Sequence, residues 1–269
     1  MQGEAVLLIA PESGGILASL AERVERLGRR LISPSSAFCR WAGDKSAVVA
    51  TLYAAGVPVP PGVRLAAADA WPDGFPSPAV LKPNDGCGSQ EIVFLDDASC
   101  DRRTTSTTDR RLERFIPGTA VSAAVIRGPT HTVVLPPCTQ KLSNGGRTAY
   151  LGGACPLPQP SAVRAERLAR RATAAMPAGF GYLGIDMVLG AADDGSTDAV
   201  IEVNPRLTTS YVGLRALCRT NLIGLMLDVG GGRSVTPEYR PGRVEFDADG
   251  TVRYFPAPQC EAAEPAVRR

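Results

Sequence analysis

Polar side chains are set into an apolar segment, AVIEVNPR, at residues 199–206. The segment has the β-branched, apolar character of a buried strand, yet it carries Glu202, Asn204 and Arg206. Residues two apart on a strand point to the same side of a sheet, so these groups are predicted to project together. Because charged groups are rarely buried without partners, the pattern indicates a polar site at this strand.

A second apolar segment, YLGIDMVLG, supplies one more acid, Asp186. The acidic turn AADDGST joins the two segments, so they are expected to be neighbouring strands with Asp186, Glu202 and Asn204 on one face. Oxygen donors without histidine or thiol match a hard cation such as Mg²⁺. The alternative is an ion pair between Glu202 and Arg206 that caps the end of a strand.

The segment VLKPNDGCGS places a lysine before a glycine-containing loop. Glycines let backbone N–H groups approach an anion, and Lys82 at the end of a strand supplies a positive charge for phosphate. The lysine precedes the glycines and a strand is expected to follow, so this is not the Walker pattern. The alternative is a tight hairpin with a solvated lysine.

Composition narrows the classes of function. The 269 residues carry a net charge of +2, with basic and acidic residues interspersed, which argues against a nucleic-acid partner. A single histidine, His131, removes most histidine-dependent catalytic schemes, and seven separately placed cysteines suggest neither a zinc site nor a disulfide framework. Without a signal sequence or an apolar run that could cross a membrane, the chain is expected to be soluble and cytoplasmic.

The elements that must position these residues follow an α/β order. We expect a strand, a glycine-containing loop and a helix at the N-terminus, then a helix over residues 44–56 that ends at Gly56. The segments AVLKP and EIVFL are expected to form a hairpin, and LERFIPG a strand that ends in a turn. A helix over AVRAERLARRATAAM precedes the two polar strands, and one last helix covers about residues 212–229.

These elements and motifs, in this order, resemble the ATP-grasp superfamily of carboxylate–amine ligases over about residues 40–230. The resemblance implies an α+β fold in which two α+β lobes clasp ATP beside a short N-terminal α/β domain. It implies boundaries at 1–60 for the N-terminal domain, 61–120 for the small lobe, and 121–269 for the large lobe with the metal site. It also implies that an acyl phosphate forms on a carboxylate before an amine displaces the phosphate.

The resemblance assigns roles to residues at matching positions. Lys45 and Lys82 would hold the ATP phosphates, and Arg206 would act with Lys82 in catalysis by facing the transferred phosphoryl group. The metal, Mg²⁺ or Mn²⁺ in its place, would be bound by Asp186, Glu202 and Asn204. The remaining ATP contacts would come from a phosphate flap and an adenine-binding hinge, namely Gly86, Cys87, Gly88 and Ser89, then Glu113 with the backbone of Arg114 and Ile116.

One family position departs from the pattern. Many members carry a glutamate for the ribose hydroxyls seven positions after the hinge acid, where this chain has Ala120. Either Ser122 or another group replaces it, or the ribose is held loosely.

Within the superfamily, the segments IAPESGGIL and NPRLTTSYVGLR look most like tyramine–glutamate ligases of methanofuran biosynthesis and their methylotroph counterparts. That match implies that Glu12 pairs with the ammonium group of an incoming amine and that Ser13 adds a hydrogen bond. It places Lys141 or Arg147 near a substrate carboxylate. The acceptor side would be lined by Thr208, Thr209, Ser210 and Tyr211. For each of these residues an ordinary surface or core position is the alternative.

The sequence therefore predicts an ATP- and Mg²⁺-dependent ligase that joins a carboxylate, the γ-carboxyl of glutamate, to an amine. Its partners would be small-molecule substrates, with no nucleic acid or membrane, and the family resemblance allows a homodimer. Two alternatives remain: a glutamate ligase that acts on a pterin cofactor, and a non-catalytic ATP-binding regulator.

Overall fold

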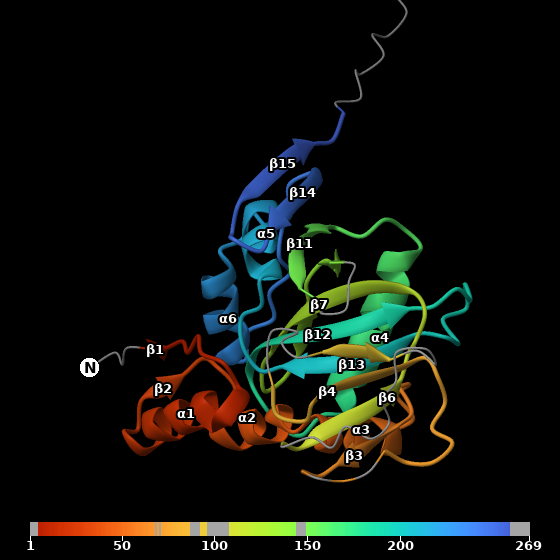
Figure 1. The fold of residues 1–269 in the computed structure, drawn as a ribbon. Coiled ribbons are helices and arrows are strands. Elements are labelled where there is room, and N and C mark those ends of the chain that lie inside the picture. The colour runs from red at the N-terminus through yellow and green to blue at the C-terminus, as the bar shows by residue number, and fades with distance from the viewer. Residues whose placement is uncertain are drawn as a thin grey trace, which may run out of the picture.

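A computed structural model describes residues 5–67, 69, 71–86, 92–95, 108–143 and 149–258. Helices and strands both contribute throughout, which confirms the predicted α+β class. Figure 1 shows the N-terminal elements at one side, two sheets against each other in the middle, and the C-terminal elements above them. No helix among the described residues is long and apolar enough to span a membrane.

The N-terminal unit begins with a short parallel pair of strands, β1 (Ala5–Val6) and β2 (Arg30–Leu31). Between them lie a 3-10 turn (Ser13–Gly15) and α1 (Ile16–Arg26). Gly14 and Gly15 adopt φ angles of 62° and 67°, which glycine accommodates without strain. The predicted strand–loop–helix order is confirmed, although the first strand is shorter than its apolar run.

Two capped helices follow. In α2 (Ser36–Gly43) the side chain of Ser35 accepts a hydrogen bond from the Phe38 N–H, and in α3 (Lys45–Ala54) Asp44 accepts one from the Ala47 N–H. The helix expected over residues 44–56 is α3, and Gly56 follows its end with a φ of 70°. Helix α2 was not predicted from the sequence.

A four-stranded antiparallel sheet, here called the small sheet, has the order β3 (Gly62–Leu65), β6 (Arg110–Arg114), β4 (Ala79–Pro83) and β5 (Val93–Leu95). The predicted hairpin is β4 paired with β5. Lys82 of β4 lies opposite Arg111 of β6, and Val80 lies opposite Glu113. Because opposite residues and residues two apart share a face, Lys82, Arg111 and Glu113 project from one side of this sheet.

The second sheet, here called the central sheet, has the order β13 (Ala199–Asn204), β12 (Gly181–Leu189), β7 (Thr119–Arg127) and β8 (Thr132–Val134), with β9 (Cys138–Thr139) also paired to β7. One face packs against α3 and α4 (Ser161–Ala175) around a buried apolar cluster that includes Leu183, Ile185 and Val203. The other face carries Asp186 and Glu202. This alternation positions the site.

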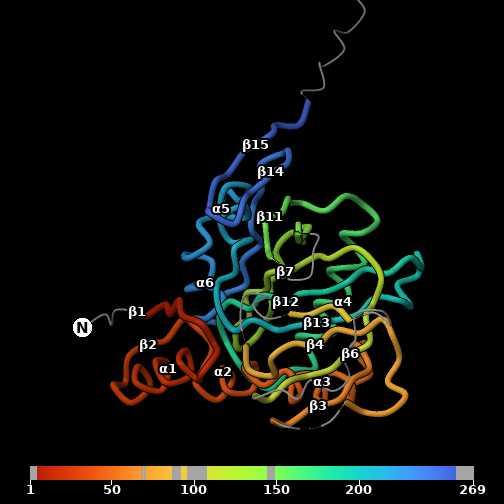
Figure 2. Tube along the Cα trace, in the orientation of Figure 1, coloured from red at the N-terminus to blue at the C-terminus, as the bar shows by residue number. Residues whose placement is uncertain are grey.

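A third sheet has the order β10 (Lys141–Leu142), β11 (Tyr150–Cys155), β14 (Gly242–Asp247) and β15 (Val252–Pro256). The chain trace in Figure 2 follows β14 and β15 next to β11 and α5. Strands β14 and β15 were not predicted from the sequence.

The prediction of a single last helix over about residues 212–229 is wrong. The structure has two helices, α5 (Ser210–Leu217) and α6 (Leu222–Gly230). The chain leaves the helix at Cys218, which is extended and forms an isolated bridge to Tyr239. Asn221 then caps α6 by accepting hydrogen bonds from the N–H groups of Ile223 and Gly224.

Candidate active site

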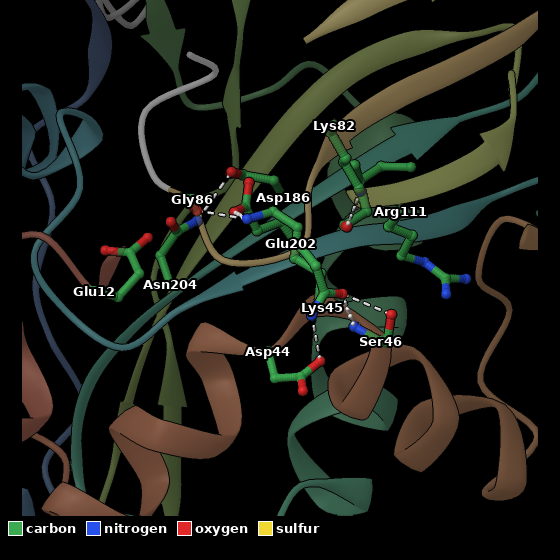
Figure 3. Close-up of polar contacts among 12 residues, drawn as sticks. Glu12, Asp44, Lys45, Ser46, Lys82, Gly86, Arg111, Asp186, Glu202 and Asn204 are labelled. Atoms are coloured by element: carbon green, nitrogen blue, oxygen red, sulfur yellow. Dashed lines mark hydrogen bonds and ion pairs between the residues drawn. The ribbon is translucent and has the colours of Figure 1, made fainter. Parts of the chain in front are cut away.

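The central sheet brings the three predicted metal ligands together. Asp186 of β12 lies directly opposite Glu202 of β13, and Asn204 lies two residues further along β13. The Asn204 amide donates to Asp186 Oδ2 at 3.0 Å, and Gln140 Nε2 donates to Asp186 Oδ1 at 2.9 Å. Figure 3 shows Asp186, Glu202 and Asn204 grouped on one side of the close-up. The predicted common face is therefore confirmed.

The electrostatics of this group favour a cation. Removal from water, followed by repulsion from Glu202, raises the pKa of Asp186 to about 7. Its two side-chain donors, Asn204 and Gln140, are neutral amides. Two carboxylates and one amide form an all-oxygen set of the kind Mg²⁺ takes, so the residues present fit a divalent cation.

The set is a small one. Among the described residues, His, Cys, Asp and Glu nowhere gather as three or more potential ligands. A cation at Asp186 and Glu202 would therefore need further oxygen ligands, from Asn204 and from water or a bound substrate, as Mg²⁺ sites commonly have.

Lys45 links α3 to this group. It is only 7% exposed, its Nζ lies 3.0 Å from Glu202 Oε1, and it also donates to the Gly86 carbonyl. The N-terminus of α3 is fixed by Asn84, whose amide donates to Asp44 and whose Oδ1 accepts from Ser46 Oγ at 2.6 Å. Lys45 thus stands between the glycine loop and a candidate metal ligand.

The small sheet contributes a buried ion cluster. Lys82 Nζ lies 2.7 Å from Glu113 Oε2, while Arg111 Nε lies 2.6 Å from Glu113 Oε1. Lys82, Arg111 and Glu113 are only 3%, 4% and 2% exposed, so solvent screens these charges weakly. Lys82 also donates to the Ile201 carbonyl at 3.2 Å, which brings the small sheet against β13. The solvated lysine considered from the sequence is thereby excluded.

Arg206, at the end of the central site, binds the N-terminal loop. Its Nε and Nη2 donate to the two carboxylate oxygens of Glu12, at 2.5 and 3.1 Å, and the Glu12 side chain is 2% exposed. Arg206 Nη2 also lies 3.5 Å from Asn204 Oδ1. Arg206 thus pairs with Glu12, whereas Glu202 pairs with Lys45.

Comparison with known proteins gives the family. The model of the ATP-grasp domain matches residues 42–210, and that of the pre ATP-grasp 3 domain matches residues 2–37. The chain belongs to the ATP-grasp family. No curated protein matches it in sequence.

Solved structures of similar fold include an ATP-grasp superfamily protein from Archaeoglobus fulgidus, 23% identical with a TM-score of 0.68 over 91% of this chain and 70% of that one. An L-amino acid ligase from Bacillus licheniformis is 20% identical, with a TM-score of 0.67 over 85% of this chain and 58% of that one. Biotin carboxylase from Campylobacter jejuni, in complex with an ATP analogue, is 18% identical, with a TM-score of 0.69 over 85% of this chain and 55% of that one. At these identities the likeness establishes the fold.

In this ATP-grasp chain the predicted adenine hinge begins in the last two residues of β6, Glu113 and Arg114. The backbone N–H of Arg114 donates to the Pro61 carbonyl at 2.8 Å, and that of Phe115 donates to the Pro78 carbonyl at 2.9 Å. The Arg114 N–H is thus already used within the small sheet, which leaves its carbonyl and the backbone of half-buried Ile116 as the candidate adenine contacts.

The position without the ribose glutamate lies on the same face of the central sheet as the candidate metal ligands Asp186 and Glu202. Ser122 of β7 lies opposite Asp186 and is 4% exposed, and Ala120 lies opposite Val188, two residues from Asp186 along β12. Ser122 therefore lies beside the candidate metal ligand Asp186.

The predicted acceptor residues lie at the start of α5. Thr208 Oγ1 and Ser210 Oγ form a hydrogen bond of 2.9 Å, Thr209 immediately precedes the helix, and the Tyr211 ring stands 6.1 Å from that of Tyr182. Gly184, opposite Asn204, leaves the space that the Thr208 side chain fills. These residues therefore border the central site.

Other predicted substrate residues are less closely placed. Ser13 begins the 3-10 turn that follows Glu12, whereas the Lys141 side chain is exposed on β10. The Gly14 N–H donates to Asp85 Oδ2 at 2.9 Å, which ties this turn to the start of the glycine loop. Cys87, Gly88, Ser89 and Arg147 lie outside the described residues.

A cavity of about 240 Å³ lies beside the N-terminal loop. It is lined by Glu12, Gly15, Cys39, Arg40, Gly43, Asp44, Arg64, Asn84, Asp85 and Asp109. Charged groups of both signs face it, and it meets the site at Glu12 and at the start of the glycine loop.

Two residues of the site were missed from the sequence. Arg111 was passed over although it lies two positions before Glu113, a spacing that puts both on one strand face. Gln140 gives no comparable signal, because the contact with Asp186 depends on how β9 pairs with β7.

Proposed function

We propose that this protein is an ATP- and Mg²⁺-dependent ligase that joins the γ-carboxyl of glutamate to an amine through an acyl phosphate. The observation that carries the proposal is the meeting of two sheet faces that carry opposite charges, here called the small-sheet wall and the central wall. Lys82 and Arg111 project from the small sheet, Asp186 and Glu202 from the central sheet, and a hydrogen bond from Lys82 to Ile201 joins the sheets. A polyphosphate with a divalent cation complements both walls.

The proposed roles of the site residues follow from their charges. Lys82 and Lys45 would bind the phosphates, since each is a buried ammonium at the site. Asp186, Glu202 and Asn204 would hold Mg²⁺, which supplies charge neutralisation for phosphoryl transfer. Phosphoryl transfer of this kind depends on positioning and electrostatics more than on a strong base, which suits a chain with one histidine.

Arg206 supports the carboxylate part of the proposal. Its Nε and Nη2 already hold a carboxylate, that of Glu12, through both oxygens. A guanidinium in this geometry suits a substrate carboxylate or the acyl phosphate made from it. The amine would enter from the side of Glu12 and Thr208, and Glu12 or water would take its proton.

The proposed substrates rest on the resemblance to tyramine–glutamate ligases of methanofuran biosynthesis. The L-amino acid ligase among the structural neighbours supports a carboxylate–amine ligase in general. The proposed division of the chain, 1–60, 61–120 and 121–269, follows the resemblance to the ATP-grasp superfamily, with the small sheet in the middle unit.

The test is release of ADP from ATP in the presence of glutamate, Mg²⁺ and a panel of aryl amines that includes tyramine. We expect release that depends on both glutamate and one of the amines, together with an amide product detected by mass spectrometry. A pterin acceptor forms a separate arm for the alternative substrate. Binding of nucleotide without turnover in any arm would overturn the ligase and favour a regulatory binder.

A further inference from the structure

We propose that Arg111 is the counter-ion that allows Lys82 to leave Glu113 for a nucleotide phosphate. The inference rests on the proposed function, in which Lys82 binds that phosphate. It gives Arg111 a positioning role that acts through Glu113 and Lys82.

The geometry shows one carboxylate shared between two cations. Glu113 offers Oε2 to Lys82 at 2.7 Å and Oε1 to Arg111 at 2.6 Å. The two cations lie opposite each other on β4 and β6, and Glu113 follows Arg111 by two residues on the same face. Because each cation uses a different oxygen, either contact can be broken while the other stays.

The burial of Glu113 makes the second cation necessary. The Glu113 side chain is 3% exposed, and a buried carboxylate that loses its partner is strongly destabilised. If Lys82 were the sole counter-ion, binding a phosphate would leave Glu113 uncompensated, and that penalty would be subtracted from nucleotide affinity. With Arg111 in place, Glu113 keeps a charge-assisted hydrogen bond when Lys82 moves.

Arginine suits this part better than lysine. A guanidinium stays charged and holds a fixed planar orientation, so its contact with Glu113 survives the departure of Lys82. The other described cations of the site are committed elsewhere, since Lys45 pairs with Glu202 and Arg206 pairs with Glu12. Arg111 is thus the cation positioned to hold Glu113.

The experiment measures the dissociation constant of a fluorescent ADP analogue with Mg²⁺, without any acceptor substrate. We expect Arg111→Met to raise this constant at least about tenfold, because Lys82 is then held by an otherwise unpaired carboxylate. In a Glu113→Gln background, where no carboxylate needs a counter-ion, adding Arg111→Met should change it less than about twofold. This difference between backgrounds is the signature of the proposal.

A matched control removes another buried arginine–carboxylate pair. Arg164 pairs with Asp198 between α4 and the start of β13, away from the nucleotide groups. Arg164→Met should lower the melting temperature while leaving nucleotide affinity unchanged. Arg111→Gln serves as a second variant that keeps a hydrogen-bond donor without the charge, and it should also weaken binding if Arg111→Met does not fold.

Two results would overturn the inference. Equal weakening by Arg111→Met in the wild-type and Glu113→Gln backgrounds would make Arg111 a direct nucleotide ligand. Unchanged affinity in Arg111→Met, or in Arg111→Gln if only that variant folds, would reduce it to a structural residue. Failure of the proposed ligase is seen separately, as nucleotide binding without turnover in any arm of the ADP-release assay. Failure of the proposed nucleotide site is seen as a wild type that binds no nucleotide, or as Lys82→Met binding as tightly as the wild type.

Discussion

The two sheets that meet at the site differ in the charge of the groups that they carry there. On the small sheet, two cations share one carboxylate, so Lys82, Arg111 and Glu113 carry an excess of positive charge. On the central sheet, two carboxylates lie opposite each other and the described donors to Asp186 are neutral amides. On the small sheet the carboxylate of Glu113 is neutralised by cations of the same sheet. On the central sheet the pKa of the Asp186 carboxyl is raised instead.

This contrast in charge indicates which kind of ligand suits each of the two sheet faces. The excess positive charge suits an anion such as a phosphate, and the paired carboxylates suit a cation. Lys45 is the exception that connects the two, because it comes from α3 and pairs with Glu202 of the central sheet. Changes that alter one wall should therefore have effects that differ in kind from changes to the other.

The largest effect is expected from removing a carboxylate of the central wall. Glu202→Gln keeps the shape of the side chain but removes the charge that would bind Mg²⁺, so ligase turnover should fall about 10³-fold. The measurement is ADP release at saturating ATP and Mg²⁺, with circular dichroism to show that the variant is folded. Turnover within about threefold of the wild type would show that Glu202 is no metal ligand.

Lys45→Met tests the link between the walls. Its loss removes one cation proposed to bind phosphate, so nucleotide affinity should fall about 10- to 100-fold. It also leaves Glu202 facing Asp186 without its ammonium partner, so Mg²⁺ alone should raise the melting temperature more than it does in the wild type. A smaller response to Mg²⁺ in the variant would contradict the view that Lys45 stands where positive charge is needed.

The raised pKa of Asp186 predicts how the stability of the protein changes with pH. This pKa is about 7 in the folded protein, above that of an unfolded aspartate, so the folded state binds the proton more tightly. The associated stability is present below about pH 4 and is lost as pH rises through about 7. Asp186→Asn should therefore raise the unfolding free energy of the metal-free protein at pH 8 by on the order of 1–3 kcal/mol, and leave it nearly unchanged at pH 4.

Mg²⁺ sharpens the same test. The cation requires the ionised carboxylate, so it should stabilise the wild type more at pH 8 than at pH 5.5, and should stabilise Asp186→Asn little at either pH. Chemical unfolding with and without Mg²⁺ provides the measurement. Equal stabilisation of wild type and variant by Mg²⁺ at pH 8 would refute the role of Asp186.

How much of this was predictable depends on how far apart the partners lie in the chain. Asp186, Glu202 and Asn204 belong to adjacent strands joined by one turn, so the two-residue period of a strand was enough to place them on one face. The ion pair between Glu12 and Arg206 spans 194 residues, and no local pattern encodes it. From the sequence, Glu12 was instead expected to meet a substrate ammonium.

The fold also contains features that depend on contacts between distant residues, and one feature that the sequence pattern does indicate. The break between α5 and α6 depends on the bridge from Cys218 to Tyr239, a tertiary contact that overrides a continuous helical pattern. The hairpin of β14 and β15 was readable, because Val244 and Phe246 alternate with polar residues ahead of a turn containing Gly250.

The last prediction tests the packing that supports the strands of Asp186 and Asn204. A Cβ at Gly184 would lie 2.4 Å from Thr208 Cγ2, so Gly184→Ala should displace Thr208 and lower the unfolding free energy by about 1–3 kcal/mol. Thr208→Ser removes that methyl group, so the double variant should recover most of the loss. Gly230→Ala, where no atom lies within 4 Å, is the matched control and should be nearly neutral.

The two readouts of the Gly184 series separate packing from charge. Because Gly184 lies opposite Asn204, displacement at this point should weaken Mg²⁺ stabilisation in Gly184→Ala and restore it in the double variant. Nucleotide affinity measured without Mg²⁺ is proposed to depend on Lys82 and Lys45, so it should stay within about twofold throughout the series. A parallel loss of both would mean that the two walls are one cooperative unit, in which the charge of each is adjusted through the other.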